Sequence, residues 1–254
     1  MLGDRGRPCK WGGLLALALS LLILYAATAG STQSAGRMAS TTLTFEALGP
    51  ASWPDLLRAG CVLQGRLRAA YPDAETLPAG AQSRPLQYTA VAGWLVVTLP
   101  PEVPAQWLVT EAARIGSVEI VEGGTEFLPL GRHVETGPLP RPELGVYEAV
   151  LTQAHFVAAD AHLRRGQPVI EVVLSPEGDA RLSAHTERQR GYYLCLLVDG
   201  EVVNCPIVRT PLADRHGFIE LTGAATLQQA RALAGLLRSG PLPVALRPIG
   251  WPGD

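Results

Sequence analysis

Charged side chains are scarce in this 254-residue chain, and neither sign of charge dominates. Only 17% of the residues are charged, 21 basic residues stand against 23 acidic ones, and Lys10 is the only lysine. Proteins that bind nucleic acid usually carry a basic patch and an isoelectric point above about 9, whereas the isoelectric point here is near 6.2. We therefore expect no nucleic-acid partner.

Cysteine and histidine are also sparse. Four cysteines in a chain of this length are too few for a disulfide scaffold. The five histidines include no pair at the spacing of a zinc site, which needs three or four ligands. The sequence contains no nucleophile elbow, no H-E-x-x-H motif and no phosphate-binding loop. It therefore predicts a protein that is not an enzyme, with no catalytic residue, no metal and no cofactor.

A long uncharged stretch lies near the N-terminus. Residues 11–30 are apolar and would form a helix about 30 Å long, which is enough to cross a bilayer. Basic residues precede this stretch, and no charge follows it before Arg37. By the positive-inside rule, the N-terminus is expected in the cytoplasm and the rest of the chain outside it.

Two interpretations of residues 1–30 remain open. As a signal anchor, the segment stays in the cell membrane as a single-pass helix. As a signal peptide, it is cleaved near Ala27-Thr28-Ala29, which matches an A-x-A site, and the product is secreted. In both cases the working part is extracytoplasmic and follows a polar tether at residues 31–41.

The remainder of the chain predicts an α+β protein of two lobes. Residues 42–128 alternate strand and helix patterns in the order β-α-β-β-α-β, with SVEIVEG as the last strand, which is typical of a ferredoxin-like unit. Residues 129–146 are rich in proline and glycine and are predicted to be a hinge. A second α+β lobe is expected at residues 147–240. Residues 241–254 supply a final strand, which could return to the first lobe as an edge strand, and a tail.

The second lobe contains a strong hairpin signal, Asp199-Gly200 between two apolar runs. A two-residue turn there pairs residue 198 with 201 and so sets Cys195 opposite residue 204. Cys205 then points to the other face, unless a bulge or a longer loop shifts the register. A Cys195–Cys205 disulfide in an oxidising compartment is therefore one alternative, and two separate apolar strand residues are the other.

The second lobe also carries a series of turn, cap and core positions that keep their order and spacing across about 85 residues. They are Glu177-Gly178, Asp199-Gly200, Pro206, Ile219, Gly223, Leu236-Leu237-Arg238, Gly240 and Leu242-Pro243. In these positions the lobe resembles the first extracytoplasmic domain of SecD, a subunit of the bacterial protein-export translocase. We interpret the following as structural turn and cap residues: Asp199, Gly200, Pro206, Gly223, Thr226, Gly240 and Pro243. Residues 55–127 are similar to the base part of that domain.

The resemblance implies an extracytoplasmic module that binds protein and catalyses nothing. Its head would swing relative to its base and hold unfolded polypeptide emerging from the translocase, or bind the translocase itself. The family's further membrane helices, and its Gly-Leu-Asp-Leu signature after the first one, are not found in this sequence. We therefore expect a stand-alone, single-anchor protein without a proton-driven motor.

Two other classes of function stay open. A sensor that binds a small molecule would show a pocket lined by convergent polar groups, although a small-molecule ligand is not the favoured expectation. A structural envelope protein would show a large exposed apolar patch without a groove.

Overall fold

The computed structural model describes residues 41–72, 86–91, 93–209, 218–222, 224 and 226–250. The predicted N-terminal helix, residues 31–40 of the tether and Gly223 lie outside this description. Within the described ranges, no helix is both long enough and apolar enough to cross a membrane. The predicted mixed helix-and-strand class is confirmed, with four α-helices assigned in the described part of the chain.

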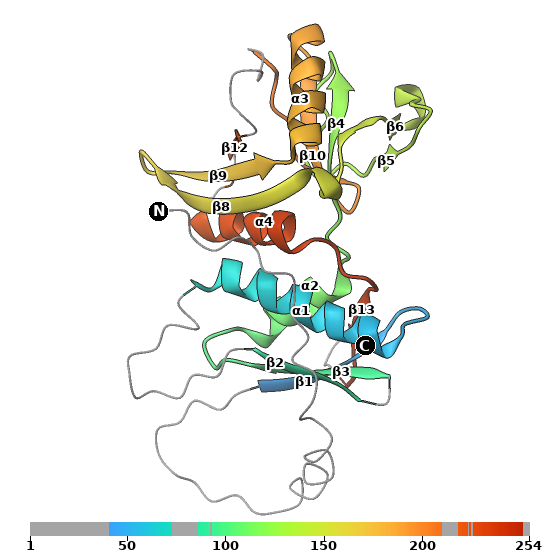
Figure 1. The fold of residues 1–254 in the computed structure, drawn as a ribbon, viewed down its shortest axis with the longest axis vertical. Coiled ribbons are helices and arrows are strands. Elements are labelled where there is room, and N and C mark those ends of the chain that lie inside the picture. Colours follow the sequence, from blue (N-terminus) through green and yellow to red (C-terminus); the bar gives the residue numbers. More distant parts are fainter. Residues whose placement is uncertain are drawn as a thin grey trace, which may run out of the picture. The chain divides into compact units, whose positions relative to one another are not determined.

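One lobe, here called the base, is built on a four-stranded antiparallel sheet in the order β13-β1-β3-β2. Its helices α1 and α2 pack against this sheet (Figure 1). The chain order β-α-β-β-α-β is the ferredoxin-like one, but the last strand, β13, comes from the far end of the sequence. The elements are β1 (Thr41–Ala47), α1 (Trp53–Ala70), β2 (Gln87–Val91), β3 (Trp94–Leu99), α2 (Ala105–Ala113) and β13 (Leu246–Pro248).

The strand expected to complete the base lies in a different sheet. Strand β4 (Val118–Gly124), which contains the SVEIVEG pattern, pairs with β10 and β7. Val118, Ile120 and Val121 of β4 are all buried, so both of its faces are covered. Alternating hydrophobicity identifies a strand without identifying its pairing partner. The sequence pattern therefore predicted the strand correctly and its neighbours wrongly.

Local signals explain the bounds of α1. The Ser52 side chain accepts a hydrogen bond from the Asp55 amide, and the Asp55 carboxylate accepts one from the Ser52 amide, which forms a capping box. Pro54 lies in the first turn, where its missing N–H costs nothing. Leucines 56, 63 and 67 recur at helical spacing and are buried against the sheet.

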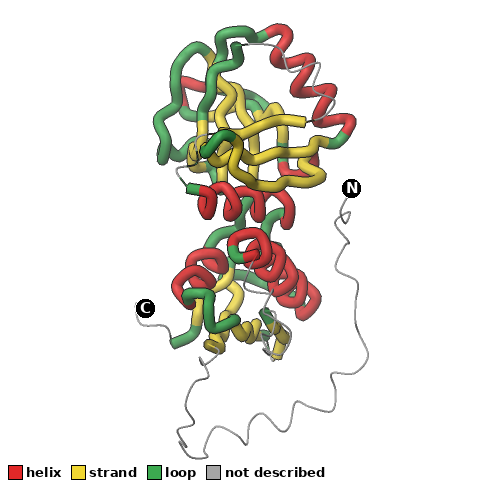
Figure 2. Tube along the Cα trace, turned by 90° about the vertical axis from the view of Figure 1, so that its left-hand side faces the viewer, coloured by secondary structure: helices red, strands yellow, loops and turns green. Residues whose placement is uncertain are grey.

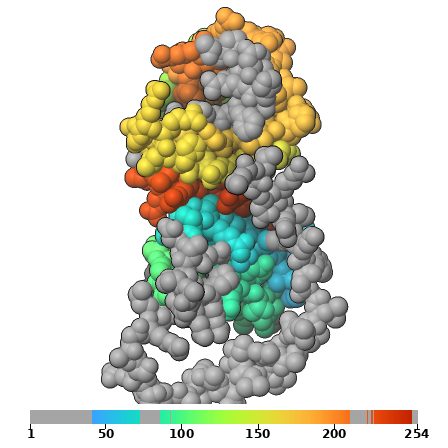
Figure 3. Space-filling view, turned by 60° about the vertical axis from the view of Figure 1, so that its left-hand side comes forward, coloured from blue at the N-terminus to red at the C-terminus, as the bar shows by residue number. Residues whose placement is uncertain are grey.

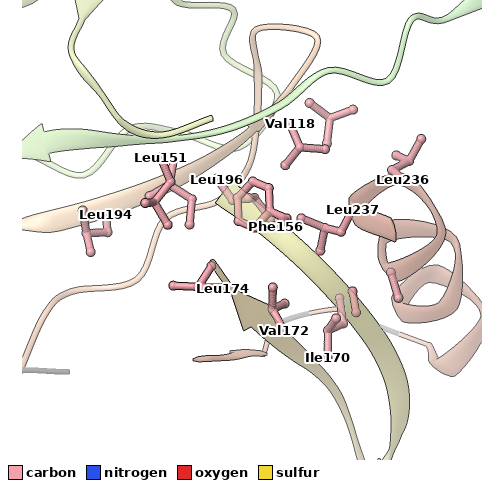
Figure 4. Packing of buried hydrophobic residues seen from close by; sticks show 14 of the residues in the cluster. Val118, Leu151, Phe156, Ile170, Val172, Leu174, Leu194, Leu196, Leu236 and Leu237 are labelled. Carbon is pink, nitrogen blue, oxygen red and sulfur yellow. The ribbon is translucent and has the colours of Figure 1, made fainter. Parts of the chain in front are cut away.

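The second lobe, here called the head, contains two further sheets and helices α3 (Pro176–Arg188) and α4 (Leu227–Ser239). The sheets have the orders β11-β10-β4-β7 and β12-β9-β8. Both sheets and α4 share one apolar core, part of which is shown in Figure 4. Besides β4, the strands of these two sheets are β7 (Ala149–Leu151), β8 (Phe156–Arg164), β9 (Gln167–Leu174), β10 (Tyr193–Val198), β11 (Glu201–Asn204) and β12 (Phe218–Thr222).

Helix α4 lies between the two lobes. One side packs on β8 and β9, and the other side packs on α1 (Figures 1 and 2). In the space-filling view, its red surface separates yellow β8 from cyan α1 (Figure 3). Gly235 permits this close approach, because a Cβ there would lie 2.9 Å from the Ala69 Cβ. The two lobes therefore meet along a helix–helix contact.

The chain crosses between the base and head sheets at residues 114–117 and again at 240–245. These two segments are tied together, since the Leu242 amide donates to the Ile115 carbonyl. Residues 129–146, which were predicted to be a hinge, do not join the two lobes and lie in the head. They carry the short parallel pair β5 (Glu135–Thr136) and β6 (Val146–Tyr147) and bond to β11 through backbone groups. Proline and glycine mark irregular backbone wherever it occurs, whether or not it joins two lobes.

Candidate functional site at the junction of base and head

The Asp199-Gly200 hairpin has a second role beyond reversing the chain. Both residues adopt positive φ, 51° and 80°, as a type I′ turn requires. The two oxygens of the Asp199 carboxylate accept hydrogen bonds from the amides of Gly116 and Ser117, at 2.9 and 2.8 Å. A Cβ on Gly200 would lie 2.6 Å from the His133 ring. The turn therefore fastens the head hairpin to the first crossing segment.

A β-bulge decides how the two hairpin cysteines face each other. Val198 pairs with Glu201, as expected for a two-residue turn, but the register shifts between Leu196 and Leu197. Val203 is the extra residue, and the shift places Cys195 opposite Cys205. The structure joins these two cysteines in a disulfide. The sequence left open whether Cys195 and Cys205 form a disulfide or stay separate, and the bulge is the feature that brings them together.

We predict that the same bond forms in protein exported to an oxidising compartment. Peptide mapping without reductant should recover Cys195 and Cys205 in one linked pair. Reduction should lower the free energy of unfolding by about 2–3 kcal/mol, because it frees a short loop in the unfolded chain. Full alkylation of both cysteines in unreduced protein would contradict the pairing.

Arg66, on the apolar side of α1, is the central residue of the junction. Its side chain is 1% exposed and ion-pairs with Glu111 at 3.5 Å. The guanidinium also donates hydrogen bonds to the carbonyls of Glu111, Ile115 and Gly240. It therefore holds both crossing segments. Burial lowers the pKa of Arg66 to about 10, while Glu111 opposes that shift, so the side chain stays charged at neutral pH.

The sequence analysis did not single out Arg66, although a signal was present. The residue lies three positions after Leu63 and four before Ala70, in the apolar stripe of the helix. A charge in such a stripe is expected to be paired when it is buried. Gly116 supports the arrangement, because a Cβ there would overlap the Arg66 guanidinium.

A cavity of about 750 Å³ opens beside this junction, between α2, α4 and the β10–β11 hairpin. One part of its lining is apolar and includes Trp107, Leu130, Ile170, Val203, Leu221 and Leu233. The polar part consists of Glu111, Arg114, His133, Asp199, Glu201, Asn204 and Gln229. Two of the apolar side chains, Leu130 and Val203, are 62% and 38% exposed. An apolar wall with a polar margin is typical of ligand-binding clefts of this size.

Several polar groups of the cavity already have partners within the protein. Glu111 lies 3.5 Å from both Arg66 and Arg114, and both Asp199 oxygens accept backbone N–H bonds. These two carboxylates are therefore engaged in holding the junction. The apolar wall carries no such bonds and is available to a partner.

A second cavity, of about 560 Å³, runs along α3 and is lined mainly by charged residues. The Nε2 of His185 lies 3.2 Å from an oxygen of Glu122, although the two groups are not aligned for a hydrogen bond. Burial lowers the pKa of His185, and Glu122 partly opposes this effect. Within the described ranges, no three His, Cys, Asp or Glu residues are grouped so that they could hold a metal ion.

The other residues singled out from the sequence are not gathered at either cavity. Thr226 begins α4 and accepts a hydrogen bond from the Gln229 amide, whereas Gly240 ends the same helix with φ 76°. The Pro206 carbonyl accepts a bond from the Leu194 amide within the hairpin, and the Pro243 side chain is exposed. These positions shape the backbone, and only the Asp199-Gly200 turn reaches the junction.

The structure is thus an α+β protein in which a head lobe is inserted before the last strand of the base, with an apolar cleft where the two lobes meet. Residues 137–244 match the family model described as the SecDF P1 head subdomain. Over these residues the chain is similar to the SecDF head subdomain, which confirms the sequence-based resemblance of the second lobe.

Individual relatives also match about a third of this chain in sequence. The protein translocase subunits SecD of Dictyoglomus turgidum and Aquifex aeolicus are 36% and 37% identical to it over 84 and 82 residues. These matches cover 33% and 32% of this chain, and 21% and 16% of the relatives. The SecDF subunit of Thermus thermophilus is 32% identical over 82 residues, which are 32% of this chain and 11% of that one. The matched region thus spans about a fifth or less of each relative.

Solved structures extend the fold likeness beyond the head. A structure titled "Structure and function of a membrane component SecDF that enhances protein export" covers 84% of this chain and all of its own, with 22% identity and a TM-score of 0.56. A SecDF crystal structure in a super-membrane-facing form covers 83% of this chain and 29% of its own, with 23% identity and a TM-score of 0.59. At these identities the likeness concerns the fold alone.

Proposed function

We propose that this chain is a non-catalytic extracytoplasmic module that assists protein export by transient binding of unfolded polypeptide. The observation that carries the proposal is the apolar wall of the 750 Å³ cavity, in a fold shared with SecDF. An unfolded chain exposes apolar side chains of many shapes, so its binding requires apolar surface and no catalytic group. On this proposal residues 1–30 anchor the protein in the cell membrane, and the module acts without a motor of its own.

A small-molecule sensor is the second candidate, because polar groups do line the cavity. The partners of Glu111 and Asp199 argue against it, since ligand recognition would have to break bonds that hold the two lobes together. Binding of a polypeptide to the apolar wall leaves those bonds intact. The polypeptide is therefore the favoured occupant.

The test uses the full chain with a photo-crosslinking amino acid at Val203, which lines the cavity. The matched control carries the same group at Val157 of β8, which is 61% exposed and absent from the cavity lining. With a denatured export substrate, Val203 should crosslink and Val157 should not. Equal crosslinking at both positions would contradict the proposed site.

Variants give an independent measurement of the same contact. Val203→Glu should weaken polypeptide binding roughly tenfold, because burying an unpaired charge costs at least about 1.4 kcal/mol. Val157→Glu should leave the dissociation constant unchanged. Wild-type affinity in Val203→Glu, or a small molecule that competes with the polypeptide at a defined stoichiometry, would favour the alternatives.

A further inference from the structure

One end of the base exposes a group of large apolar side chains that the proposed polypeptide site does not use. Leu48, Trp53, Val91 and Trp94 are 57%, 54%, 48% and 48% exposed. We call these four residues the apolar tip. Single exposed hydrophobic residues are ordinary on protein surfaces, whereas a cluster with two tryptophans marks an interaction site.

Strand pairing shows that the four residues lie at the same end of the sheet. Val91 pairs with Trp94 across the β2–β3 turn, and Trp94 lies opposite Glu46 near the end of β1. Leu48 follows directly after β1. The Trp53 indole N–H, from the start of α1, donates to the Ala90 carbonyl at 3.1 Å. Two separate chain segments therefore converge on the tip.

Charge is sparse around these four residues. Residues 47–54 and 86–101 lack Asp, Glu, Lys and Arg altogether. The carboxylate of Glu46, opposite Trp94, is neutralised by an ion pair with Arg247. The indole N–H of Trp53 is satisfied by the Ala90 carbonyl, and the ring is still 54% exposed. Tryptophan with aliphatic neighbours is the composition found where proteins contact the boundary between lipid headgroups and acyl chains.

The length of the polar tether allows such a contact. Residues 31–40 separate the apolar stretch 11–30 from Thr41 at the start of β1. An extended chain of that length reaches at most about 35–40 Å, and β1 itself spans about 20 Å. The tip can therefore reach the surface of a bilayer that holds residues 11–30. This step rests on the membrane anchor of the proposed function.

We propose that the apolar tip inserts into the headgroup–acyl boundary of the membrane, so that the base lobe contacts lipid directly. The partner is a lipid surface, recognised through apolar area and interfacial tryptophan and not through charge. Residues of the head, including the cavity wall, are not part of this contact.

The test places the full chain in vesicles of phosphatidylethanolamine and phosphatidylglycerol that contain a lipid with a photoreactive acyl chain. Peptides that carry residues 48–53 and 91–94 should be labelled. Two equally exposed aliphatic residues of β8 in the head, Val157 and Leu163, serve as the internal control at 61% and 55% exposure. We expect at least about fivefold more label on the tip peptides than on the β8 peptide.

Variants separate lipid contact from chance labelling. Val91→Ser with Trp94→Ser should reduce the label on the tip by about fivefold, whereas Val157→Ser with Leu163→Ser should leave it unchanged. Retention of the chain in the vesicles with equal label on tip and control would overturn this proposal while leaving polypeptide binding untouched. Failure of the chain to stay with the vesicles would overturn it together with the proposed anchor. Crosslinks from the tip to a protein in place of lipid would also overturn it.

Discussion

The Arg66→Leu variant is expected to lose about 3–5 kcal/mol of unfolding free energy, because it removes one partner of a buried ion pair. The change strands the Glu111 carboxylate, which is 8% exposed, and frees carbonyls in both crossing segments. Arg114 remains 3.5 Å from Glu111 and offsets part of the loss. Equilibrium unfolding in urea, followed by circular dichroism, measures the difference.

The matched control lies on the same helix. Arg58 forms an ion pair with Asp55, but its side chain is 68% exposed. Arg58→Leu should cost less than about 1 kcal/mol, since solvent screens exposed pairs. Similar losses in the two variants would mean that Arg66 does not hold the junction. Arg66→Lys should fall between them, because it keeps the charge and loses the planar fork of donors.

Substitution of Asp199 is expected to cause the second large loss of unfolding free energy. Asp199→Ala leaves the partly buried amides of Gly116 and Ser117 without their acceptor and places alanine at a positive φ. Together these should lower the free energy of unfolding by about 3–4 kcal/mol. Asp199→Asn keeps one side-chain oxygen and tolerates the left-handed conformation, so its loss should be about half as large.

An exposed aspartate provides the comparison for this series. Asp160 lies on β8 opposite Glu171, so Asp160→Ala should change stability by no more than about 0.5 kcal/mol. The same urea titration applies to all three variants. An equal loss of unfolding free energy in Asp199→Ala and Asp199→Asn would show that the hydrogen bonds from the crossing segment to the carboxylate contribute little to stability.

The Asp199 result also bears on function. If the crossing segment loosens while the head stays folded, crosslinking at Val203 should change, because the cavity is bounded by both lobes. If the variant merely lowers stability, crosslinking per folded molecule should stay constant below the unfolding transition. The two readouts together distinguish a structural fastening from one that shapes the binding site.

Local structure was largely predictable from the sequence. The α1 bounds follow from Ser52, Pro54 and the leucine spacing, and the Asp199-Gly200 pair predicted the hairpin turn that the structure has. These signals act within a few residues, through helix caps and positive φ angles. They can therefore be identified from the sequence without knowing the fold. The head was also recognisable, because its turn residues keep their order along the chain.

The tertiary structure decided everything that depends on distant partners. Strand β4 lies in the head, where β10 and the head core cover its two buried faces. The return of β13 to the edge of the base sheet is the one long-range pairing that the sequence had suggested. The bulge at Leu196/Leu197, and with it the cysteine pairing, depends on strand packing that no local pattern encodes. Arg66 shows the same limit, since its role comes from carbonyls 45 to 174 positions away along the chain. The sequence by itself determined the elements and the kind of domain, and packing alone determined the junction and its cavity.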